Sequence, residues 1–230
     1  MDNKNNRYIP EHTSILRNNI VRVPPIIRDA TGIIIFGKRI KSLLFTTDVA
    51  IIKNTNADAI IAVYPFTPQP AITQALMNVA DIPVLCGVGG GLTQGSRSVS
   101  IAQDAEYQGA LAVVLNAPTP EETIRNVKNS VFIPVVLTLV SEATSIEEKI
   151  AAGADIINVS GGLKTAEIVR QIRLKYPKLA IIATGGPTEE TIKEVIAAGA
   201  NAITYTPPTN GELFKIKMEH YREEEENKHK

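Results

Sequence analysis

Short apolar runs alternate with segments of helical periodicity from residue 40 onward, and this alternation constrains the fold more than any other feature of the chain. Each run has four to eight residues, many of them β-branched, and is too short for a typical helix. Continuous apolarity over such a length is typical of a strand buried on both faces of a parallel sheet. The predicted strands are residues 40–47, 59–64, 83–87, 110–116, 134–139, 155–159, 180–184 and 202–206.

The segments between these strands carry helix signals. Thr119 and Thr188 precede acidic first turns in "TPEET" and "PTEET", where N-capping and the helix dipole favour such residues. Gly153 and Gly199, in "AAGAD" and "AAGAN", lie where a left-handed residue commonly ends a helix. The predicted helices are residues 49–54, 69–79, 98–108, 120–129, 145–152, 164–175, 189–198 and 211–223.

Eight strands that alternate with eight helices in 230 residues predict a (β/α)8 barrel, the TIM-barrel architecture. An open doubly wound sheet is the rival, but such sheets usually have fewer strands. Residues 147–162 are similar to residues 193–208, which supports repeated βα units. We expect residues 1–39 to form an N-terminal extension packing on the barrel, residues 40–223 to form the barrel, and residues 224–230 to form a charged tail.

Charge and cysteine content narrow the functional class. Lysine plus arginine equals aspartate plus glutamate at 24 each, so no net field favours nucleic acid or an acidic membrane surface. Cys86 is the single cysteine, which excludes an internal disulfide and fits a reducing compartment. No apolar run approaches the roughly 18 residues of a membrane span, and the polar N-terminus lacks a signal-peptide core. We expect a cytoplasmic protein that binds a small molecule, with no nucleic-acid or membrane partner; a homo-oligomer stays open.

In a (β/α)8 barrel the functional site lies at the carboxyl ends of the strands. These ends carry mostly hydroxyls, amides and glycines, with two carboxylates, Asp48 and Glu142. Asp48 directly precedes a helix and is either an N-cap or a general base. Glu142 is either a catalytic group or a solvated loop residue. Asn116 and Asn158 end buried strands, where an amide needs partners, and are candidates for ligand contact.

No predicted strand end carries a lysine or a histidine. Lys164, the nearest lysine, is better placed to reach an anion than to form an imine, which argues against a Schiff-base aldolase. His12, His220 and His229 lie near the termini, so a strand-end zinc or iron cluster is not predicted. We predict no organic cofactor, and dependence on other metal ions stays open.

Glycine pairs follow two of the strands, at residues 161–162 and 185–186. Glycine lets the backbone approach a ligand closely, and N–H groups at a helix start bind anions. Phosphate sites in these barrels use the loops after the seventh and eighth strands, where the second pair lies. A plain turn between strand and helix is the alternative for both pairs. After the eighth strand, Pro207 and Pro208 carry no N–H, which removes half of the usual phosphate contacts.

The segment "ATGG", followed after one residue by "TEETIKEVIAAGANAI", resembles the ribulose-phosphate-binding barrel group of phosphosugar epimerases, isomerases and aldolases. The motif resemblance covers the last third of the chain. It implies an enzyme that acts on an anionic, phosphorylated substrate by isomerase, epimerase or lyase chemistry. Asp48 or Glu142 would then transfer the proton. The expected substrate-binding and phosphate-binding residues are Arg97, Asn116, Asn158, Gly161, Gly162, Thr184, Gly185, Gly186 and Thr206.

A second glycine-rich stretch, "GVGGGLTQGSRS" at residues 87–98, is long for a loop between strand and helix. Long loops of this kind are often lids or binding loops. Arg97 lies where the following helix begins and is the cationic candidate for an anionic substrate. Cys86, just before the loop, is more typical of a small buried residue than of a nucleophile.

Three alternatives stay open at this point. The first is a hydrolase in which a carboxylate and the hydroxyl-rich rim position water. The second is a non-catalytic barrel that senses a metabolite or acts as a scaffold, which the scarcity of ionisable strand-end residues favours. The third is a flavin barrel, because glycine pairs also suit the phosphate of FMN; it ranks low since no basic residue is evident for the flavin ring.

Overall fold

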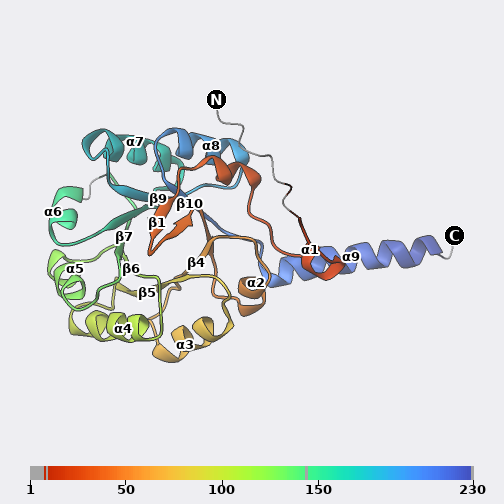
Figure 1. The fold of residues 1–230 in the computed structure, drawn as a ribbon, viewed down its shortest axis with the longest axis horizontal. Helices are drawn as coiled ribbons and strands as arrows, with labels where there is room; N and C mark the ends of the chain where they lie inside the picture. Colours follow the sequence, from red (N-terminus) through yellow and green to blue (C-terminus); the bar gives the residue numbers. More distant parts are fainter. Residues whose placement is uncertain (1–7, 9, 143–144, 229–230) are drawn as a thin grey trace.

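The computed structural model describes residues 8, 10–142 and 145–228. Eight parallel strands close into a barrel, and helices alternate with them around its outside (Figure 1). The predicted (β/α)8 barrel is therefore confirmed. Around the barrel the strands run β3 (Ser42–Phe45), β4 (Ala59–Ala62), β5 (Val84–Gly90), β6 (Ala112–Asn116), β7 (Val135–Leu139), β8 (Ile156–Val159), β9 (Ala180–Thr184) and β10 (Ala202–Tyr205).

Each barrel strand is followed by a helix, and most helix bounds differ from the predicted ones by only one or two residues. Thr188 caps its helix as predicted, since its hydroxyl accepts from the Thr191 N–H. Gly153 and Gly199 have the positive φ expected of residues that end helices. The helices are α2 (Val49–Lys53), α3 (Pro70–Val79), α4 (Ser96–Tyr107), α5 (Glu121–Lys128), α6 (Ile146–Ala151), α7 (Thr165–Lys175), α8 (Glu189–Ala197) and α9 (Asn210–Lys228).

Strand side chains divide between two apolar cores because successive residues of a strand point to opposite faces. Leu44, Ile60 and Leu115 belong to the outer core, between the sheet and the helices. Leu43 and Ile61 belong to the inner core, which fills the barrel. This inner packing ends below the carboxyl ends of the strands, where polar side chains replace the apolar ones.

The amino ends of the strands are fixed by side chains that accept backbone N–H groups. Asp155 accepts from the Val135 N–H at 2.8 Å, and Asn201 accepts from the Ile181 N–H at 3.0 Å. These two residues close the similar segments "AAGAD" and "AAGAN", so the internal echo marks equivalent structural positions. Residues at this face of a barrel serve stability rather than chemistry.

The N-terminal segment covers the barrel in two places. A hairpin of β1 (Ile33–Ile35) and β2 (Lys38–Ile40) adds Ile33, Ile35 and Ile40 to the inner core, and so closes the amino end of the barrel. Before it, the 3-10 helix η1 (Pro25–Asp29) packs against α8, with Ile27 buried in the outer core. The short helix α1 (Ile15–Asn18) precedes it.

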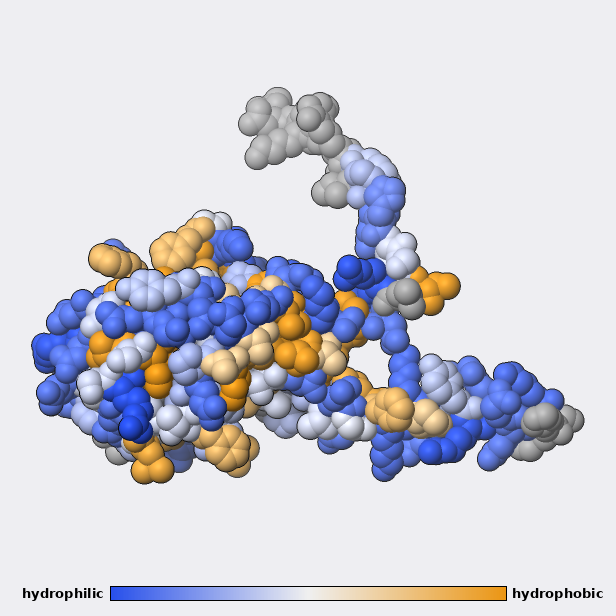
Figure 2. All heavy atoms as spheres, turned by 90° about the horizontal axis from the view of Figure 1, so that it is seen from below, coloured by the Kyte–Doolittle hydropathy of each residue, from blue (hydrophilic) through white to orange (hydrophobic). Residues whose placement is uncertain are grey.

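The position of the eighth barrel helix is taken by this N-terminal segment rather than by α9. Val21 bridges to Thr55 just after α2 while η1 contacts α8, so residues 21–29 span the gap between those two helices. The last helix α9 extends away from the barrel (Figure 1) and buries no residue. Residues 224–228, expected as a tail, continue this helix. Its projecting part is largely hydrophilic (Figure 2).

The predicted long loop at residues 87–98 is shorter than expected. Strand β5 continues to Gly90 across an irregularity between Gly87 and Gly89, and α4 begins at Ser96. Only residues 91–95 remain as a connection. The glycines concealed the strand because glycine is depleted in strands.

Candidate functional site

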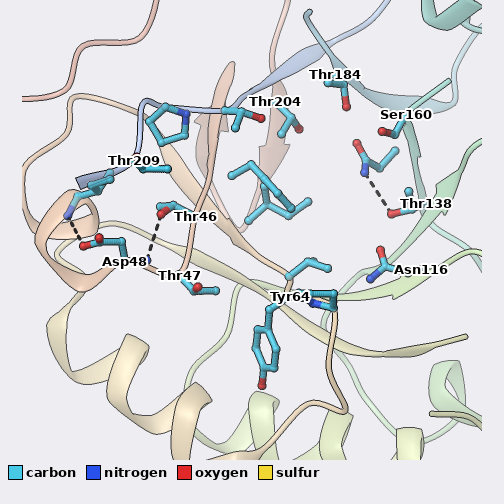
Figure 3. Close-up of a pocket in the computed structure, with 18 of the residues that line it drawn as sticks. Thr46, Thr47, Asp48, Tyr64, Asn116, Thr138, Ser160, Thr184, Thr204 and Thr209 are labelled. Atoms are coloured by element: carbon cyan, nitrogen blue, oxygen red, sulfur yellow. Dashed lines mark hydrogen bonds between the residues drawn. The ribbon is translucent and has the colours of Figure 1, made fainter. Parts of the chain in front are cut away.

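A cavity of about 690 Å³ opens at the carboxyl ends of the strands, where the sequence predicts the site. Figure 3 shows hydroxyl and amide side chains from several strands and loops facing this shared space. Its volume lies within the range of small-molecule sites. The polar residues that line it are Thr46, Thr47, Asp48, Tyr64, Asn116, Thr138, Asn158, Ser160, Thr184, Thr204, Thr206, Thr209 and Asn210.

The most buried polar side chains of the lining are Thr138, Asn158 and Thr204, which line this mouth cavity together with the buried Ile61. Asn158 is 6% exposed and donates from Nδ2 to the Thr138 hydroxyl at 3.1 Å. The Oδ1 of Asn158 has no protein partner, nor does the hydroxyl of Thr204, which is 5% exposed. Buried polar atoms are normally satisfied, so these two oxygens, which are closed off from the cavity surface, are exceptions.

Asp48 lines the same cavity and also caps α2. Its Oδ1 accepts from the N–H groups of Ala50 at 2.8 Å and Ile51 at 3.2 Å. Its own N–H donates to the Thr46 hydroxyl at 3.1 Å. The N-cap reading of Asp48 is therefore confirmed: Oδ1 holds the helix start, and the residue lies at the cavity wall. Its role as a general base stays a prediction.

Charge is scarce in the mouth cavity. Among the described residues that line it, Asp48 is the one carboxylate, and no lysine, arginine or histidine is present. The wall therefore offers no amine for a Schiff base. The described part of the chain also holds no cluster of three or more His, Cys, Asp or Glu side chains able to bind a metal ion.

A groove of about 740 Å³ adjoins the mouth cavity on the side of β9 and β10. The two spaces share Thr184, Thr204 and Thr206, together with the proline pair after β10. The groove adds Gly186 and, from the first turns of α9, Lys215 with the two carboxylates of Glu212 and Glu219. The Lys215 side chain is 76% exposed and lies 4.0 Å from Glu219. This is the one cation that lines either space among the described residues.

The turn after β9 differs from the phosphate grip that the glycine pair predicts. Gly185 donates its N–H to the Thr204 carbonyl at 3.1 Å, so this donor is already used. A Cβ at Gly185 would lie 2.7 Å from Ile203 and 2.8 Å from Ile192, which gives the glycine a packing reason. The capping box of Thr188 and Thr191 satisfies further donors at the start of α8. Of the two glycines predicted to bind phosphate, Gly186 lines the groove and Gly185 does not.

A carboxylate also occupies the start of α8. Hydrogen bonds from the backbone N–H of Glu190 itself and from the Thr188 side chain lower the pKa of the Glu190 carboxyl group. A carboxylate close to the first turn of a helix is favoured by the helix dipole.

Besides Gly185 and Gly186, four of the predicted site residues lie outside the mouth cavity. Glu142 is exposed and lies 3.8 Å from Lys164, so the ion pair joins two loop residues at the rim. Arg97 is exposed in the first turn of α4. Gly161 donates its N–H to the Thr165 hydroxyl, and the Gly162 carbonyl accepts from that same hydroxyl. The structure does not bring these four together with Asp48.

Asn116, Asn158, Thr184 and Thr206 do line the mouth cavity, as predicted for ligand-binding residues. The sequence interpretation did not select Thr138, Thr204 or Lys215. Strand alternation offers a signal for the two threonines, because each follows an inward-facing apolar residue by two positions. Lys215 carries no such signal, since its place depends on the direction of α9.

Cys86 is buried in the outer core and faces away from the mouth cavity. Burial, with a smaller contribution from Asp104, raises the pKa of the thiol to about 12. The thiolate is the reactive species, so we expect iodoacetamide at pH 8 to leave the native protein unmodified. Mass spectrometry of native and urea-unfolded samples checks this, and rapid alkylation of the native protein would contradict the buried position.

A comparison with models of known protein families gives no match. A comparison with curated proteins finds a "putative N-acetylmannosamine-6-phosphate 2-epimerase" of Caldanaerobacter subterraneus subsp. tengcongensis, 29% identical over 143 residues. The match covers 50% of this chain and 58% of the relative, so the chain spans little more than half of that protein.

Solved structures with similar folds are enzymes of several kinds. A phosphonopyruvate hydrolase in complex with oxalate and Mg++ has 13% identity and a TM-score of 0.60 over 81% of each chain. A 2,3-dimethylmalate lyase of the PEP mutase/isocitrate lyase superfamily has 13% identity and a TM-score of 0.59, covering 92% of this chain and 85% of that one. At such identities these likenesses show the fold.

The comparisons agree with the resemblance read from the "ATGG" segment. The chain is a closed (β/α)8 barrel, and the curated relative is described as a phosphosugar epimerase. No helix in the described part of the chain is long and apolar enough to cross a membrane.

Proposed function

We propose that this chain is a (β/α)8-barrel enzyme that acts on a small phosphorylated metabolite in the mouth cavity, by isomerase, epimerase or lyase chemistry. The observation that carries the proposal is the combination of one fixed carboxylate, Asp48, with a ring of hydroxyls and amides in one cavity of small-molecule size. The similarity to a phosphosugar epimerase supports the substrate class.

The chemistry that suits this cavity is proton transfer next to a carbonyl group. Asp48 would take the proton from the carbon that bears a hydroxyl beside the carbonyl, leaving an enediolate. Thr138 lines the cavity, and its hydroxyl would donate to the oxygen on which charge develops. When the proton returns to the neighbouring carbon and the hydroxyl proton moves to the former carbonyl oxygen, the product is the isomer. When the proton returns to the other face of the same carbon, the product is the epimer.

The number of bases favours the first of these outcomes. Moving a proton between neighbouring carbons on one face needs a single base, whereas inversion at one carbon normally needs a second acid on the opposite face. Asp48 is the one carboxylate among the described lining residues. A one-base isomerisation therefore fits the cavity better than a two-base epimerisation.

The phosphate of such a substrate fits the adjoining groove. Thr206 supplies a hydroxyl there, Gly186 a close backbone approach, and Lys215 a cation that a phosphate would share with Glu219. These contacts replace the donors that Gly185, Pro207 and Pro208 do not provide.

The experiment that tests the proposed function is solvent exchange in D2O. Proton NMR follows the signal of the hydrogen next to the carbonyl in N-acetylmannosamine 6-phosphate and in a panel of aldose and ketose phosphates. Loss of this signal in at least one compound, dependent on the protein, is the expected result. Retention of the signal in every compound that binds would favour the non-catalytic sensor, which the scarcity of ionisable groups also supports.

Replacing Lys215 by Gln should weaken binding of a sugar phosphate about fivefold, because an exposed cation contributes about 1 kcal/mol to an anion contact. Lys217→Gln is the matched control, since Lys217 lies on the same helix outside the groove. Isothermal titration of the parent and both variants measures the effect. Equal affinities for the two variants would contradict a phosphate position at Lys215.

A further inference from the structure

A second cavity, of about 500 Å³, lies between the loops that follow β4 and β5, and we call it the side cavity. It shares Val63, Tyr64, Pro65, Asn116 and Ala117 with the mouth cavity, so the two spaces adjoin each other. In the closed ring of eight strands, β5 lies four strands from β9. The side cavity is therefore on the opposite side of the mouth from the groove.

The described lining of the side cavity contains no aspartate, glutamate, lysine, arginine or histidine. Its glycines come from the glycine-rich stretch at residues 87–98, whose backbone N–H groups an anion would use. However, Gly90 donates its N–H to the Thr93 carbonyl at 2.8 Å, and Gly91 donates its N–H to the Pro118 carbonyl at 2.9 Å. This wall of the cavity therefore offers neither a charged side chain nor these two backbone donors to an anion.

Side-chain hydroxyls of the lining are also engaged within the protein. The Thr93 hydroxyl donates to the Thr67 hydroxyl at 3.2 Å, which ties the loop after β5 to the loop after β4. The Tyr64 hydroxyl accepts from the Gln69 N–H at 2.9 Å, which holds the phenol ring at the boundary of the two cavities. The side cavity is thus preformed, and it suits a group that brings few hydrogen-bonding atoms of its own.

Two large apolar side chains line the side cavity and are open to solvent. Phe66, in the loop after β4, is 75% exposed, and Leu92, in the loop after β5, is fully exposed. Single exposed apolar residues are common, but two of them beside one cavity that adjoins a candidate site indicate a contact surface. An apolar group bound there would remove both side chains in part from water.

We propose that the side cavity binds an uncharged, largely apolar group, and that the ligand of the mouth cavity carries this group as a substituent. The inference rests on the proposed function and adds a substrate class to it: sugar phosphates that bear an apolar substituent. An ionised substituent would lose its hydration in the side cavity without an opposite charge among the described lining residues.

Three fragments of similar size test the side cavity without a sugar phosphate. At pH 7.5 benzyl alcohol is neutral, benzoate is an anion and benzylamine is a cation. In ligand-observed NMR titrations we expect benzyl alcohol to bind at least about tenfold more tightly than either charged fragment. Equal binding of the three, or a preference for a charged one, would overturn the uncharged subsite.

The double substitution Phe66→Ala and Leu92→Ala locates the bound fragment. Because both side chains are exposed, the midpoint of urea unfolding should stay unchanged, while the affinity for benzyl alcohol should fall about fivefold or more. Phe132→Ala with Leu163→Ala is the matched control, since these side chains are of the same types, are almost fully exposed and line neither cavity. Equal affinities of the two double variants for benzyl alcohol would place the fragment elsewhere and overturn the inference.

N-acyl derivatives of glucosamine 6-phosphate test the substituent. By isothermal titration the N-hexanoyl compound should bind at least about tenfold more tightly than the N-acetyl compound, because its added methylenes are buried. This gain should be lost in the Phe66→Ala and Leu92→Ala protein and kept in the control.

The outcomes differ for the two proposals. Equal binding of the two N-acyl compounds would overturn the apolar substituent and leave the sugar-phosphate site standing. If neither compound binds while benzyl alcohol does, the side cavity stands as a subsite for apolar groups, and the sugar phosphate as substrate is overturned. If none of the compounds binds, both proposals are overturned.

Discussion

Asp48→Asn is expected to reduce the rate of solvent exchange on a turned-over substrate by about 10²–10⁴-fold, the usual contribution of a general base. Asp48 is the one carboxylate among the described residues that line the mouth cavity. Because asparagine caps helices about as well as aspartate, the free energy of unfolding should change by less than about 0.5 kcal/mol. The substitution therefore separates the proton-transfer role from the capping role, which a change to alanine would not.

Glu142→Gln is the control for this prediction. Glu142 was the other candidate base, and it lies in an exposed ion pair with Lys164 outside the cavity. Loss of this exposed carboxylate should leave the exchange rate within about twofold of the parent, since surface pairs contribute little. A Glu142→Gln enzyme that is as slow as Asp48→Asn would move the catalytic role to the loop after β7.

Gly90→Ala is expected to destabilise the protein by about 3 kcal/mol or more, the largest effect on stability that we predict. The backbone of Gly90 has φ +107°, which suits glycine. A Cβ there would also lie 2.1 Å from the carbonyl oxygen of Asn116 and 2.7 Å from its main-chain nitrogen. These are backbone atoms of the neighbouring strand β6, which have no space to withdraw.

Gly91→Ala provides the comparison. Gly91 also has positive φ, at +58°, but nothing lies within 4 Å of a Cβ at this position. Gly91→Ala should lower the free energy of unfolding by about 1 kcal/mol, which is the cost of placing alanine in a left-handed backbone conformation. Urea unfolding of both variants measures the difference. Similar free energies of unfolding would mean that β5 and β6 are not in close contact at Gly90 and that Asn116 is not held there.

The barrel was predictable from sequence because each of its strands is buried on both faces. Runs such as residues 180–184 are continuously apolar, and helices of matching length follow them, so the local pattern and the closed barrel agree. The sequence pattern was less informative where tertiary contacts determine the local structure. The strand ending at Gly90 reads as a loop, and the segment at residues 21–29 gives no sign that it replaces a barrel helix.

The candidate site was predictable in its position and only in part in its residues. Asp48 and Asn158 follow from strand order, since both stand at carboxyl ends of barrel strands. Glu142 and Arg97 satisfy the same rule, yet their side chains lie outside the cavity because loop conformation, not strand order, directs them. The glycine pair at residues 185–186 was expected to hold phosphate with backbone donors, but Gly185 gives its N–H to Thr204. The position of Lys215 was not predictable, because it depends on the direction of α9, which extends away from the barrel.

A crystal structure of the protein with glucitol 6-phosphate tests the central claim most directly. The account predicts the phosphate in the groove beside Lys215, within hydrogen-bond reach of the Thr206 hydroxyl, and the sugar-alcohol chain in the mouth cavity beside the Asp48 carboxylate. Phosphate bound inside the mouth cavity, or a ligand held at Arg97 with the mouth cavity filled only by water, would contradict it.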